Sequence, residues 1–368
     1  MKLRLDTGNK ASDIYPLIQQ FGNGTHTGEI SLADRPYEMD ISLEIPNGVH
    51  IVGDWWAKQP WQTWNRKGTI FWASGTQHGN IKLKGWSSGI HNCMFIQNQD
   101  PYGPGWTPRE HHWFVEMWSD DHYISNCLFD HCTRGITQRW DIGFSGRCKL
   151  EWLWMHCFEC SIDLWNYADV PYLNNIHIWP FGQQNSYGED WERANSTGLR
   201  MRRVDNPSIS NLFTIWKNKG IHLTTGGAGS VSSIKGTNLE FDAGGYGIYI
   251  DQSNSQRHMI NGLKSNGDGQ DGSMAIRVIG NNNQMTINGL GTRPHHKNCV
   301  RIDGNDNYLR INGGMIEDWD TVRLGYPALE CVGGSNSIID ASDITFKYGG
   351  SNLIGWNGKV NLYNFRRI

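Results

Sequence analysis

Two acidic residues, Glu116 and Asp163, each occupy the middle of a short apolar triplet, Val-Glu-Met and Ile-Asp-Leu. In an extended chain the middle residue points away from its neighbours, so both carboxyl groups are expected on an outer surface. Two carboxyl groups can act together, one donating a proton and the other activating water. Trp118 and Trp165 follow the acids by two residues. Because indole faces stack on the apolar faces of sugar rings, this composition indicates carbohydrate chemistry.

Basic residues accompany the acids. When all such triplets are aligned, the outward column contains Lys82, Glu116, Thr137, Asp163, Arg200 and His222. The next outward column contains Trp118, Arg139, Trp165 and Arg202. Arginines pair well with the carboxylates of acidic sugars. The predicted catalytic residues are Glu116 and Asp163, and the predicted substrate-binding residues are Trp118, Arg139, Trp165, Arg200, Arg202, Trp106, Trp191 and His222.

The elements that would position these residues recur along the chain. The apolar triplets start at Ile81, Val115, Ile136, Ile162, Leu199, Ile221, Ile248, Ile276, Val300 and Val322. Their spacings are 34, 21, 26, 37, 22, 27, 28, 24 and 22, and seven of the nine lie between 21 and 28, the size of one β-helix coil. The two long spacings indicate insertions. Strands of neighbouring coils lie about 4.8 Å apart, so Glu116 and Asp163, two coils apart, are about 9.6 Å apart at the backbone. Inverting glycosidases separate their carboxyls by about 6.5–9.5 Å and retaining ones by about 5.5 Å, which favours inversion.

A second register supports the first. Ile90, Ile124, Leu173 and Ile209 are each followed two residues later by asparagine, at Asn92, Asn126, Asn175 and Asn211. Stacked asparagines can form a hydrogen-bonded ladder at a bend, and Trp152 interrupts the series. Cys93 and Cys127 occupy matching places in HNCMF and SNCLF, so we expect buried, stacked thiols.

The bulk composition excludes several functions. Gly contributes 44 of 368 residues and charged residues only 19 %, which is typical of many short strands and turns. The formal net charge of −3 argues against nucleic-acid binding. The sequence contains no run of 18 apolar residues, so we expect no segment that inserts into a membrane. The N-terminus lacks an apolar signal core, so we expect either release without a signal, as for virion components on lysis, or a missing leader.

The N-terminal region adds a resemblance to a known family. A short helix at 13–21, DIYPLIQQF, is followed by a Gly-initiated strand and the string IPNGVHIVG. This order resembles the start of the right-handed parallel β-helix proteins of the pectate-lyase-like superfamily, which includes many bacteriophage tailspikes. The resemblance implies an all-β, single-stranded right-handed parallel β-helix of about eleven coils. Residues 1–40 would form a cap and the initial strands, residues 41–368 the helix, and insertions would lie at 54–68, 100–112 and 181–198. The last two should leave one edge roughly 14 Å apart and wall a groove.

The resemblance implies a tailspike-like virion protein of the phage tail. Such a protein acts extracellularly, binds and cleaves a bacterial surface polysaccharide, and assembles as a homotrimer with other virion proteins. Hydrolysis is favoured over β-elimination. Two alternatives stay open: a noncatalytic receptor-binding spike, and a bacterial pectate-lyase-like lyase whose base would be Arg139, Arg200, Arg202 or His222.

No cofactor or metal is predicted. Calcium neutralises the substrate in related lyases, but Asp120-Asp121 is typical of a turn and lacks the oxygen spacing of a calcium loop. The strings Glu110-His111-His112 and Asp120-Asp121-His122 match no established zinc spacing. Further acids that could replace a catalytic carboxylate are Asp120, Asp121, Asp130, Glu159 and Asp169.

Overall fold

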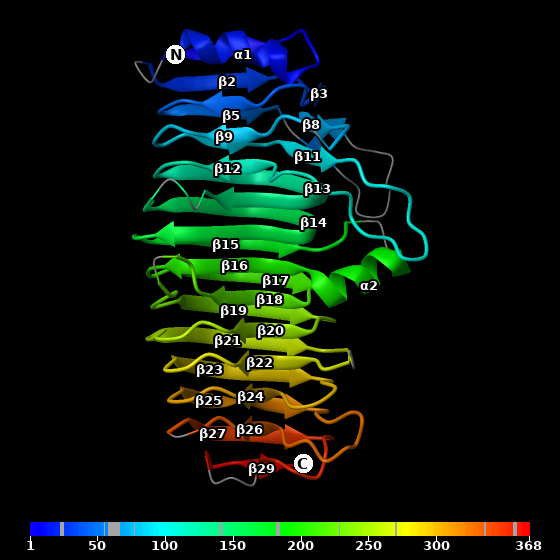
Figure 1. Ribbon diagram of the computed structural model, residues 1–368, viewed down its shortest axis with the longest axis vertical. Coiled ribbons are helices and arrows are strands. Elements are labelled where there is room, and N and C mark those ends of the chain that lie inside the picture. The colour runs from blue at the N-terminus through cyan, green and yellow to red at the C-terminus, as the bar shows by residue number, and fades with distance from the viewer. Residues whose placement is uncertain are drawn as a thin grey trace. The chain divides into compact units, whose positions relative to one another are not determined.

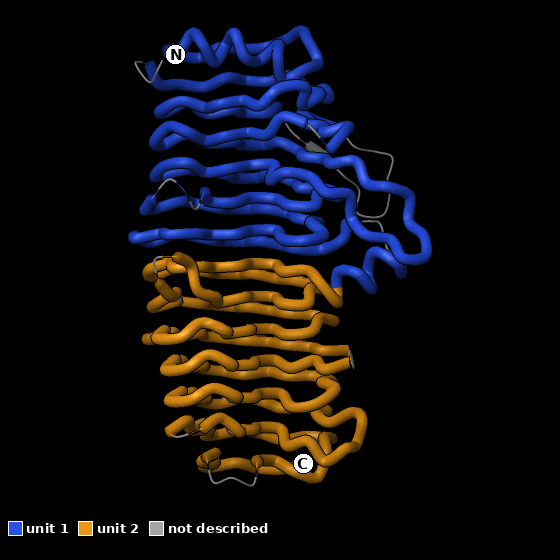
Figure 2. The backbone as a smooth tube through the Cα atoms, viewed as in Figure 1, with its two compact units in different colours: residues 1–192 blue, residues 193–368 orange. Residues whose placement is uncertain are grey.

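The computed structural model divides into two compact units, Met1–Glu192 and Arg193–Ile368 (Figure 2). The described residues are 1–22, 26–54, 56–57, 67–76, 78–139, 141, 143–181, 185–227, 229–268, 271–334, 336–355 and 359–368.

Unit 1 is built from parallel strands that recur coil after coil (Figure 1). Its elements are β1 (Lys2–Leu5), α1 (Ala11–Gln20), β2 (Gly28–Leu32), β3 (Pro36–Glu38), β4 (Leu43–Ile45), β5 (Val49–Gly53), β6 (Trp56–Ala57), β7 (Lys67–Gly68), β8 (Ile70–Ala73), β9 (Ile81–Leu83), β10 (Gly89–His91), β11 (Met94–Gln97), β12 (Val115–Met117), β13 (His122–Gln138), β14 (Cys148–Tyr167), β15 (Pro171–Ile178) and the start of α2 (Ser186–Asn195). The helix predicted at 13–21 is thus confirmed as α1.

Unit 2 repeats a thinner coil. Its strands are β16 (Thr197–Val204), β17 (Ser208–Ile215), β18 (Lys219–Thr224), β19 (Lys235–Asp242), β20 (Tyr246–Ile250), β21 (His258–Asn266), β22 (Met274–Val278), β23 (Gln284–Arg293), β24 (Val300–Ile302), β25 (Tyr308–Glu317), β26 (Leu329–Cys331), β27 (Ile338–Lys347), β28 (Val360–Tyr363) and β29 (Arg366–Arg367). Neither described helix is long and apolar enough to span a bilayer.

The apolar triplets form one parallel sheet in each unit, which we call the triplet face. In unit 1 it joins β4, β9, β12 and the ends of β13 and β14. The triplet residues Val115, Met117 and Ile162 are fully buried because alternate side chains of a strand point to opposite faces. In unit 2 the face joins β16, β18, β20, β22, β24 and β26.

One predicted triplet is wrong. The strand that pairs with Val300 begins at Leu329, not at Val322. Val322 lies partly exposed in a connection in which Asp318, Asp320 and Arg323 adopt positive φ. The apolar pattern at Val322 therefore belongs to a turn and not to a strand. The fully buried side chain that starts the strand is Leu329.

Asparagines form the predicted ladder at a bend of the coil. Asn92 and Asn126 have φ of 58° and 51°, a left-handed conformation that asparagine tolerates better than most residues. Asn126 Nδ2 donates to Asn92 Oδ1 at 2.7 Å. In unit 2, Asn238 Nδ2 donates to Asn211 Oδ1 at 3.2 Å. Trp152, which interrupts the series, occupies the same bend at φ 54°.

The interior of unit 1 is a stack of rings and thiols. Phe71, Phe95 and Phe129 stack with centroid separations of 5.6 and 4.5 Å between neighbours. All eight cysteines of the chain are buried, as predicted. Burial raises the pKa of the Cys127 thiol to about 12, so this thiol is an inert core group rather than a nucleophile.

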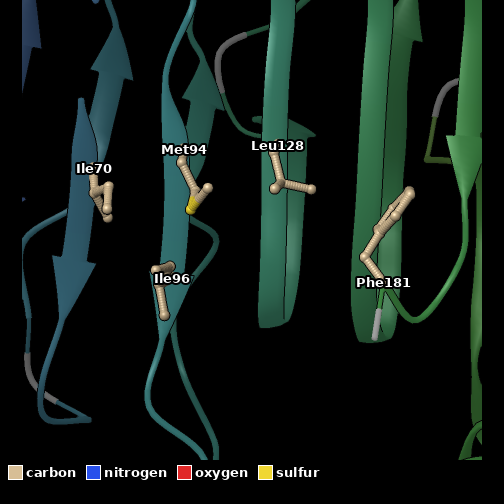
Figure 3. Close-up of a cluster of buried hydrophobic side chains, with 5 residues drawn as sticks. All are labelled: Ile70, Met94, Ile96, Leu128 and Phe181. Atoms are coloured by element: carbon tan, nitrogen blue, oxygen red, sulfur yellow. The ribbon is translucent and has the colours of Figure 1, made fainter. Parts of the chain in front are cut away.

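A second apolar cluster lies on the opposite side of the same sheet (Figure 3). Met94 and Ile96 flank Phe95, so alternation directs them away from the ring stack. Trp154 and Trp179 pack against the cluster, whose members are Ile70, Met94, Ile96, Leu128 and Phe181. Trp154 and Trp179 therefore cover one side of this sheet.

The three predicted insertions do not all lie where the sequence analysis placed them. Most of 54–68 lies outside the described residues, and its ends pair antiparallel as β6 and β7. The segment after β11 approaches α2 (Figure 1). A Cβ on Gly188 would lie 2.8 Å from Tyr102 Cε1, so the insertions at 100–112 and 181–198 pack together at this point instead of standing roughly 14 Å apart.

Candidate functional site

The two predicted catalytic carboxylates lie in register on the triplet face of unit 1. Glu116 on β12 pairs with Thr137 on β13, and Thr137 pairs with Asp163 on β14. Two strand spacings separate the acids, about 9.6 Å at the backbone. The apolar neighbours of each acid are held in the core, so the alternation of the strand directs both acids away from it. The expected outer surface holds for Glu116, which stays partly exposed, and not for Asp163, which is buried.

Glu116 is held by three donors. Asn80 Nδ2 donates to Oε1 at 2.9 Å, and Trp118 Nε1 donates to Oε2 at 3.0 Å. Arg139 Nη1 lies 3.5 Å from Oε2. The side chain keeps 12 % of its exposure, so a ligand can still reach it.

Asp163 repeats the arrangement two coils later. Trp165 Nε1 donates to Asp163 Oδ2 at 3.0 Å, which reproduces the pairing of Trp118 with Glu116. Thr137 Oγ1 donates to the backbone oxygen of Asp163 at 3.2 Å and so fixes the strand. Asp163 is only 2 % exposed. Each acid is therefore oriented by the indole that follows it by two residues.

The indole of Trp118 lies among cations. The Arg139 guanidinium carbon is 4.2 Å from the ring centroid, and Lys84 Nζ is 4.9 Å away. Asp141 bonds Arg139, and this hydrogen bond is the largest cause of the raised pKa of Arg139. The same bond lowers the pKa of Asp141. A fixed cation over an aromatic ring suits an acidic sugar, because the ring offers a stacking face and the guanidinium a carboxylate partner.

The remaining predicted residues lie elsewhere. The structure does not support the prediction that Trp106 binds substrate. Trp106 is only 9 % exposed, and its ring centroid lies 4.8 Å from that of Tyr102 and 5.0 Å from that of Phe158, so it offers no face to a ligand. Trp191 lies half-buried on α2. The structure thus brings Glu116, Asp163, Trp118, Arg139 and Trp165 to one face of unit 1.

Arg200, Arg202 and His222 belong to unit 2. Arg200 pairs in register with His222, and His222 Nε2 lies 2.8 Å from Asp251 Oδ2. The imidazole also packs against Tyr249, with ring centroids 5.4 Å apart. These residues form a second polar group on the triplet face of their own unit.

The other acids considered as replacements make structural contacts. Arg147 bonds Asp121 at 2.6 Å, which is the largest cause of the lowered pKa of Asp121, and it also reaches Asp169 at 3.2 Å. Glu159 accepts a bond from Arg134 at 2.8 Å, and Asp120 accepts one from a backbone N–H. These contacts hold Asp120, Asp121, Glu159 and Asp169 in the fold.

Sequence reasoning missed Asn80, Lys84 and Asp141. Asn80 stands directly before a triplet and carries no pattern of its own. The repeated spacing Glu-x-Trp and Asp-x-Trp, by contrast, was visible in the sequence as a sign that each indole serves its acid.

The histidine-acid strings near the site are engaged in the fold. His111 lies 2.8 Å from the backbone oxygen of Asn98. The Ser119 backbone N–H donates to His122 Nε2 at 3.0 Å. Among the described residues, a different group, Asp130, His131 and His156, has the geometry to hold a metal ion.

No family model and no curated protein matches this chain in sequence. Among solved structures, it is similar to the DFA-IIIase of Arthrobacter chlorophenolicus A6 in complex with DFA-III, with a TM-score of 0.63 and 12 % identity over 98 % of this chain and 97 % of that chain. It is also similar to the catalytic unit of a thermostable GH87 α-1,3-glucanase from Streptomyces thermodiastaticus strain HF3-3, with a TM-score of 0.60 and 9 % identity over 98 % and 68 %.

The fold is a right-handed parallel β-helix. The resemblance to the pectate-lyase-like superfamily predicted this fold. The parallel registers of both units and the similarity to the solved structures confirm the prediction. At such low identities the similarity establishes the fold alone. The chemistry has to be argued from the residues of this chain.

Proposed function

We propose that the triplet face of unit 1 binds a polysaccharide and hydrolyses it with Glu116 and Asp163. The observation that carries this proposal is the register of the two acids, each hydrogen-bonded by an indole N–H. A catalytic group must be held in one orientation to act, and these bonds provide that orientation. The α-1,3-glucanase among the similar structures supports a polysaccharide substrate.

The separation of the acids favours inversion. Their backbones are about 9.6 Å apart, near the upper end of the 6.5–9.5 Å of inverting glycosidases and well above the roughly 5–5.5 Å of retaining ones. In such a reaction one carboxyl group protonates the leaving oxygen while the other activates a water on the opposite face of the sugar. Thr137 lies between the acids in the same register and is 5 % exposed.

The cations on the face favour an acidic polysaccharide. Arg139 and Lys84 surround Trp118, and Arg139 is fixed by Asp141. A sugar stacked on this indole would place a carboxylate near the guanidinium.

The test is reducing-end release on a panel of bacterial capsular and O-antigen polysaccharides. The wild-type chain should cleave at least one acidic polymer, while Glu116→Gln and Asp163→Asn bind the same polymer without cleaving it. Glu330→Gln is the matched control, because Glu330 is the outward acid of a triplet in unit 2, where it pairs in register with Arg301. Full cleavage by both site variants would refute the pair.

The product reports the reaction class. Inversion at the anomeric carbon, followed by NMR during cleavage, supports hydrolysis by this pair. An unsaturated uronate, detected by its ultraviolet absorbance, would instead establish the lyase alternative. Binding without cleavage across the panel would favour the noncatalytic receptor-binding spike.

We also propose the biological setting predicted above, a homotrimeric tailspike-like virion protein that acts on the bacterial surface. The support is the parallel β-helix and the carbohydrate-suited face of unit 1. Light scattering of the purified chain tests the trimer. Adsorption of the labelled chain to bacteria with and without their surface polysaccharide tests the target.

A further inference from the structure

A buried group of histidines and carboxylates lies in unit 1, separate from the residues assigned to the carbohydrate site. Asp130 and His131 lie on β13, His156 lies on β14, and Glu192 lies on α2. Their exposed fractions are 0, 5, 1 and 1 %. Four ionisable side chains buried together are costly unless charge is balanced within the group.

The geometry brings metal-binding atoms together. One donor atom each from Asp130, His131 and His156 lies within 4.8 Å of the other two. His131 Nδ1 is 2.8 Å from Asp130 Oδ1, and the two imidazole centroids are 4.6 Å apart. The donors of a tetrahedral zinc ion lie about 3.3 Å apart for bonds of about 2.0 Å. Small side-chain rotations would therefore close the group around an ion.

Glu192 contacts the imidazole of His156. Its Oε1 lies 3.0 Å from His156 Nε2. Metal-bound imidazoles almost always bond a carboxylate or carbonyl through the other ring nitrogen, which fixes the tautomer and the ring. Glu192 is thus placed as the orienting carboxylate of His156.

The backbone bends at His131. Its φ is 57°, and the pairing of β13 with β14 shifts register between Phe129 and Cys132. A bulge re-aims the side chains beside it. Here the bulge places Asp130 and His131 side by side with His156.

The buried face of α2 is polar, which a purely structural helix would avoid. The buried residues of the helix are Gly188 and Glu192, one turn apart. Gly188 packs on Tyr102, whose pKa is raised first by burial and then by the charges of Glu192 and Asp130. The helix and the segment after β11 therefore meet at the histidine-carboxylate group. An ion there would fasten both segments to the coil.

Solvent has a route to the group. His131 lines a pocket of about 260 Å³ together with residues 96–102. An ion could enter through this pocket, which would also hold the water that fills the fourth position of a three-ligand site.

We propose that Asp130, His131 and His156 bind a divalent first-row transition-metal ion, with Glu192 orienting His156. Two imidazoles and one carboxylate form a donor set that both Zn²⁺ and Fe²⁺ accept, whereas Mg²⁺ and Ca²⁺ prefer oxygen donors alone. A divalent charge would neutralise the two buried carboxylates. The proposal revises the prediction that the chain holds no metal.

The test titrates the chelator-treated full chain with Co²⁺, followed by its visible absorption, and then displaces Co²⁺ with Zn²⁺ or, without oxygen, with Fe²⁺. We expect one ion per chain and a spectrum of nitrogen and oxygen ligands. Asp130→Asn and His156→Gln should each weaken binding at least a hundredfold. His112→Gln is the control, because His112 is an exposed histidine on the neighbouring connection and should leave binding unchanged.

The displacement of Co²⁺ identifies the preferred metal, because whichever of Zn²⁺ and Fe²⁺ displaces it at the lower concentration binds the site more tightly. Circular dichroism checks that each variant is folded. Should a variant fail to fold, zinc-soaked crystals of the wild-type chain decide by the anomalous peak. A peak among Asp130, His131 and His156 supports the site. No binding by the wild-type chain, binding unchanged in the two variants, or a peak elsewhere would overturn it.

Discussion

The triplet faces of the two units have the same backbone register and different side-chain chemistry. In unit 2 the outward residues largely neutralise one another across neighbouring strands. Arg301 bonds Glu330 at 2.8 Å and Asp303 at 2.7 Å, and Arg277 bonds Asp303 at 3.1 Å. In unit 1, Glu116 and Asp163 each accept a bond from an indole N–H group, and Arg139 lies 3.5 Å from Glu116. The comparison indicates that a β-helix can stabilise an outward charge by a partner charge on a neighbouring strand or by a neutral donor.

This difference bears on function. An ion pair commits both charges to each other, although exposed pairs stabilise by only about 0–1 kcal/mol. An indole donor orients a carboxylate without cancelling its charge. Glu116 and Asp163 each accept a bond from an indole donor, and Glu116 has Arg139 at 3.5 Å as well, whereas Glu330 pairs with Arg301 at 2.8 Å.

The largest expected effect is on kcat, when the acids of unit 1 are substituted and compared with an acid of unit 2. Glu116→Gln and Asp163→Asn should each lower kcat on a cleaved polysaccharide about a thousandfold, since a positioned acid or base contributes 10²–10⁴. Glu330→Gln in unit 2 should leave kcat unchanged. Initial rates of reducing-end release measure all three. An equal loss in Glu330→Gln would remove the distinction between the faces.

A second prediction concerns the shared core. Ile162 in unit 1 and Ile276 in unit 2 are both fully buried triplet residues. Each substitution to alanine should lower the free energy of unfolding by about 2–5 kcal/mol, because lost burial and a cavity add together. Urea denaturation measures both. Costs that differ widely would show that the units pack their cores differently.

Buried histidines make both units sensitive to acid. Burial lowers the pKa of His122 in unit 1 and of His258 in unit 2 to about 4. Below pH 6.5 the unfolded chain binds a proton at each site that the folded chain does not bind. Stability should therefore fall as the pH drops from about 6.5 to about 4, by about 3 kcal/mol at most per histidine.

Urea denaturation at pH 7 and pH 5 measures this effect. His122→Gln and His258→Gln should each make stability less dependent on pH. An unchanged slope in either variant would mean that the substituted histidine does not titrate between the folded and unfolded states.

A smaller effect sharpens the role of the indoles. Trp118→Phe keeps the ring and removes the N–H that bonds Glu116. Losing one bond to a charged group should lower kcat/KM about tenfold. Tyr249→Phe, a ring on the triplet face of unit 2, is the matched control and should change little. If Trp118→Phe retains full kcat/KM, orientation by the indole is unimportant.

The smallest expected effect concerns the asparagine ladder. Trp152 is 53 % exposed and occupies the left-handed bend at φ 54°. Trp152→Asn should stabilise the chain by about 1 kcal/mol, because asparagine tolerates this conformation and can bond its neighbours. Asn238→Ala in unit 2, where Asn238 Nδ2 bonds Asn211, should cost a similar amount. Thermal unfolding compares them, and a destabilised Trp152→Asn would assign Trp152 a packing role.

The sequence by itself determined the coil and the register of the acids. Apolar side chains on both sides of Glu116, Thr137 and Asp163 must face the core, so the period of the triplets is enough to stack the three outward residues. The asparagine bends were visible for the same reason, since a left-handed position restricts the residue type.

Only the tertiary structure decided where the connections pack. Trp106 is buried and the insertions meet at Tyr102 and Gly188, because long connections fold by contacts between distant residues that leave no periodic signal. The group of Asp130, His131, His156 and Glu192 arises in the same way, from a bulge, a neighbouring strand and a helix. Periodicity specifies which residues share a face, whereas close packing decides which side chains touch.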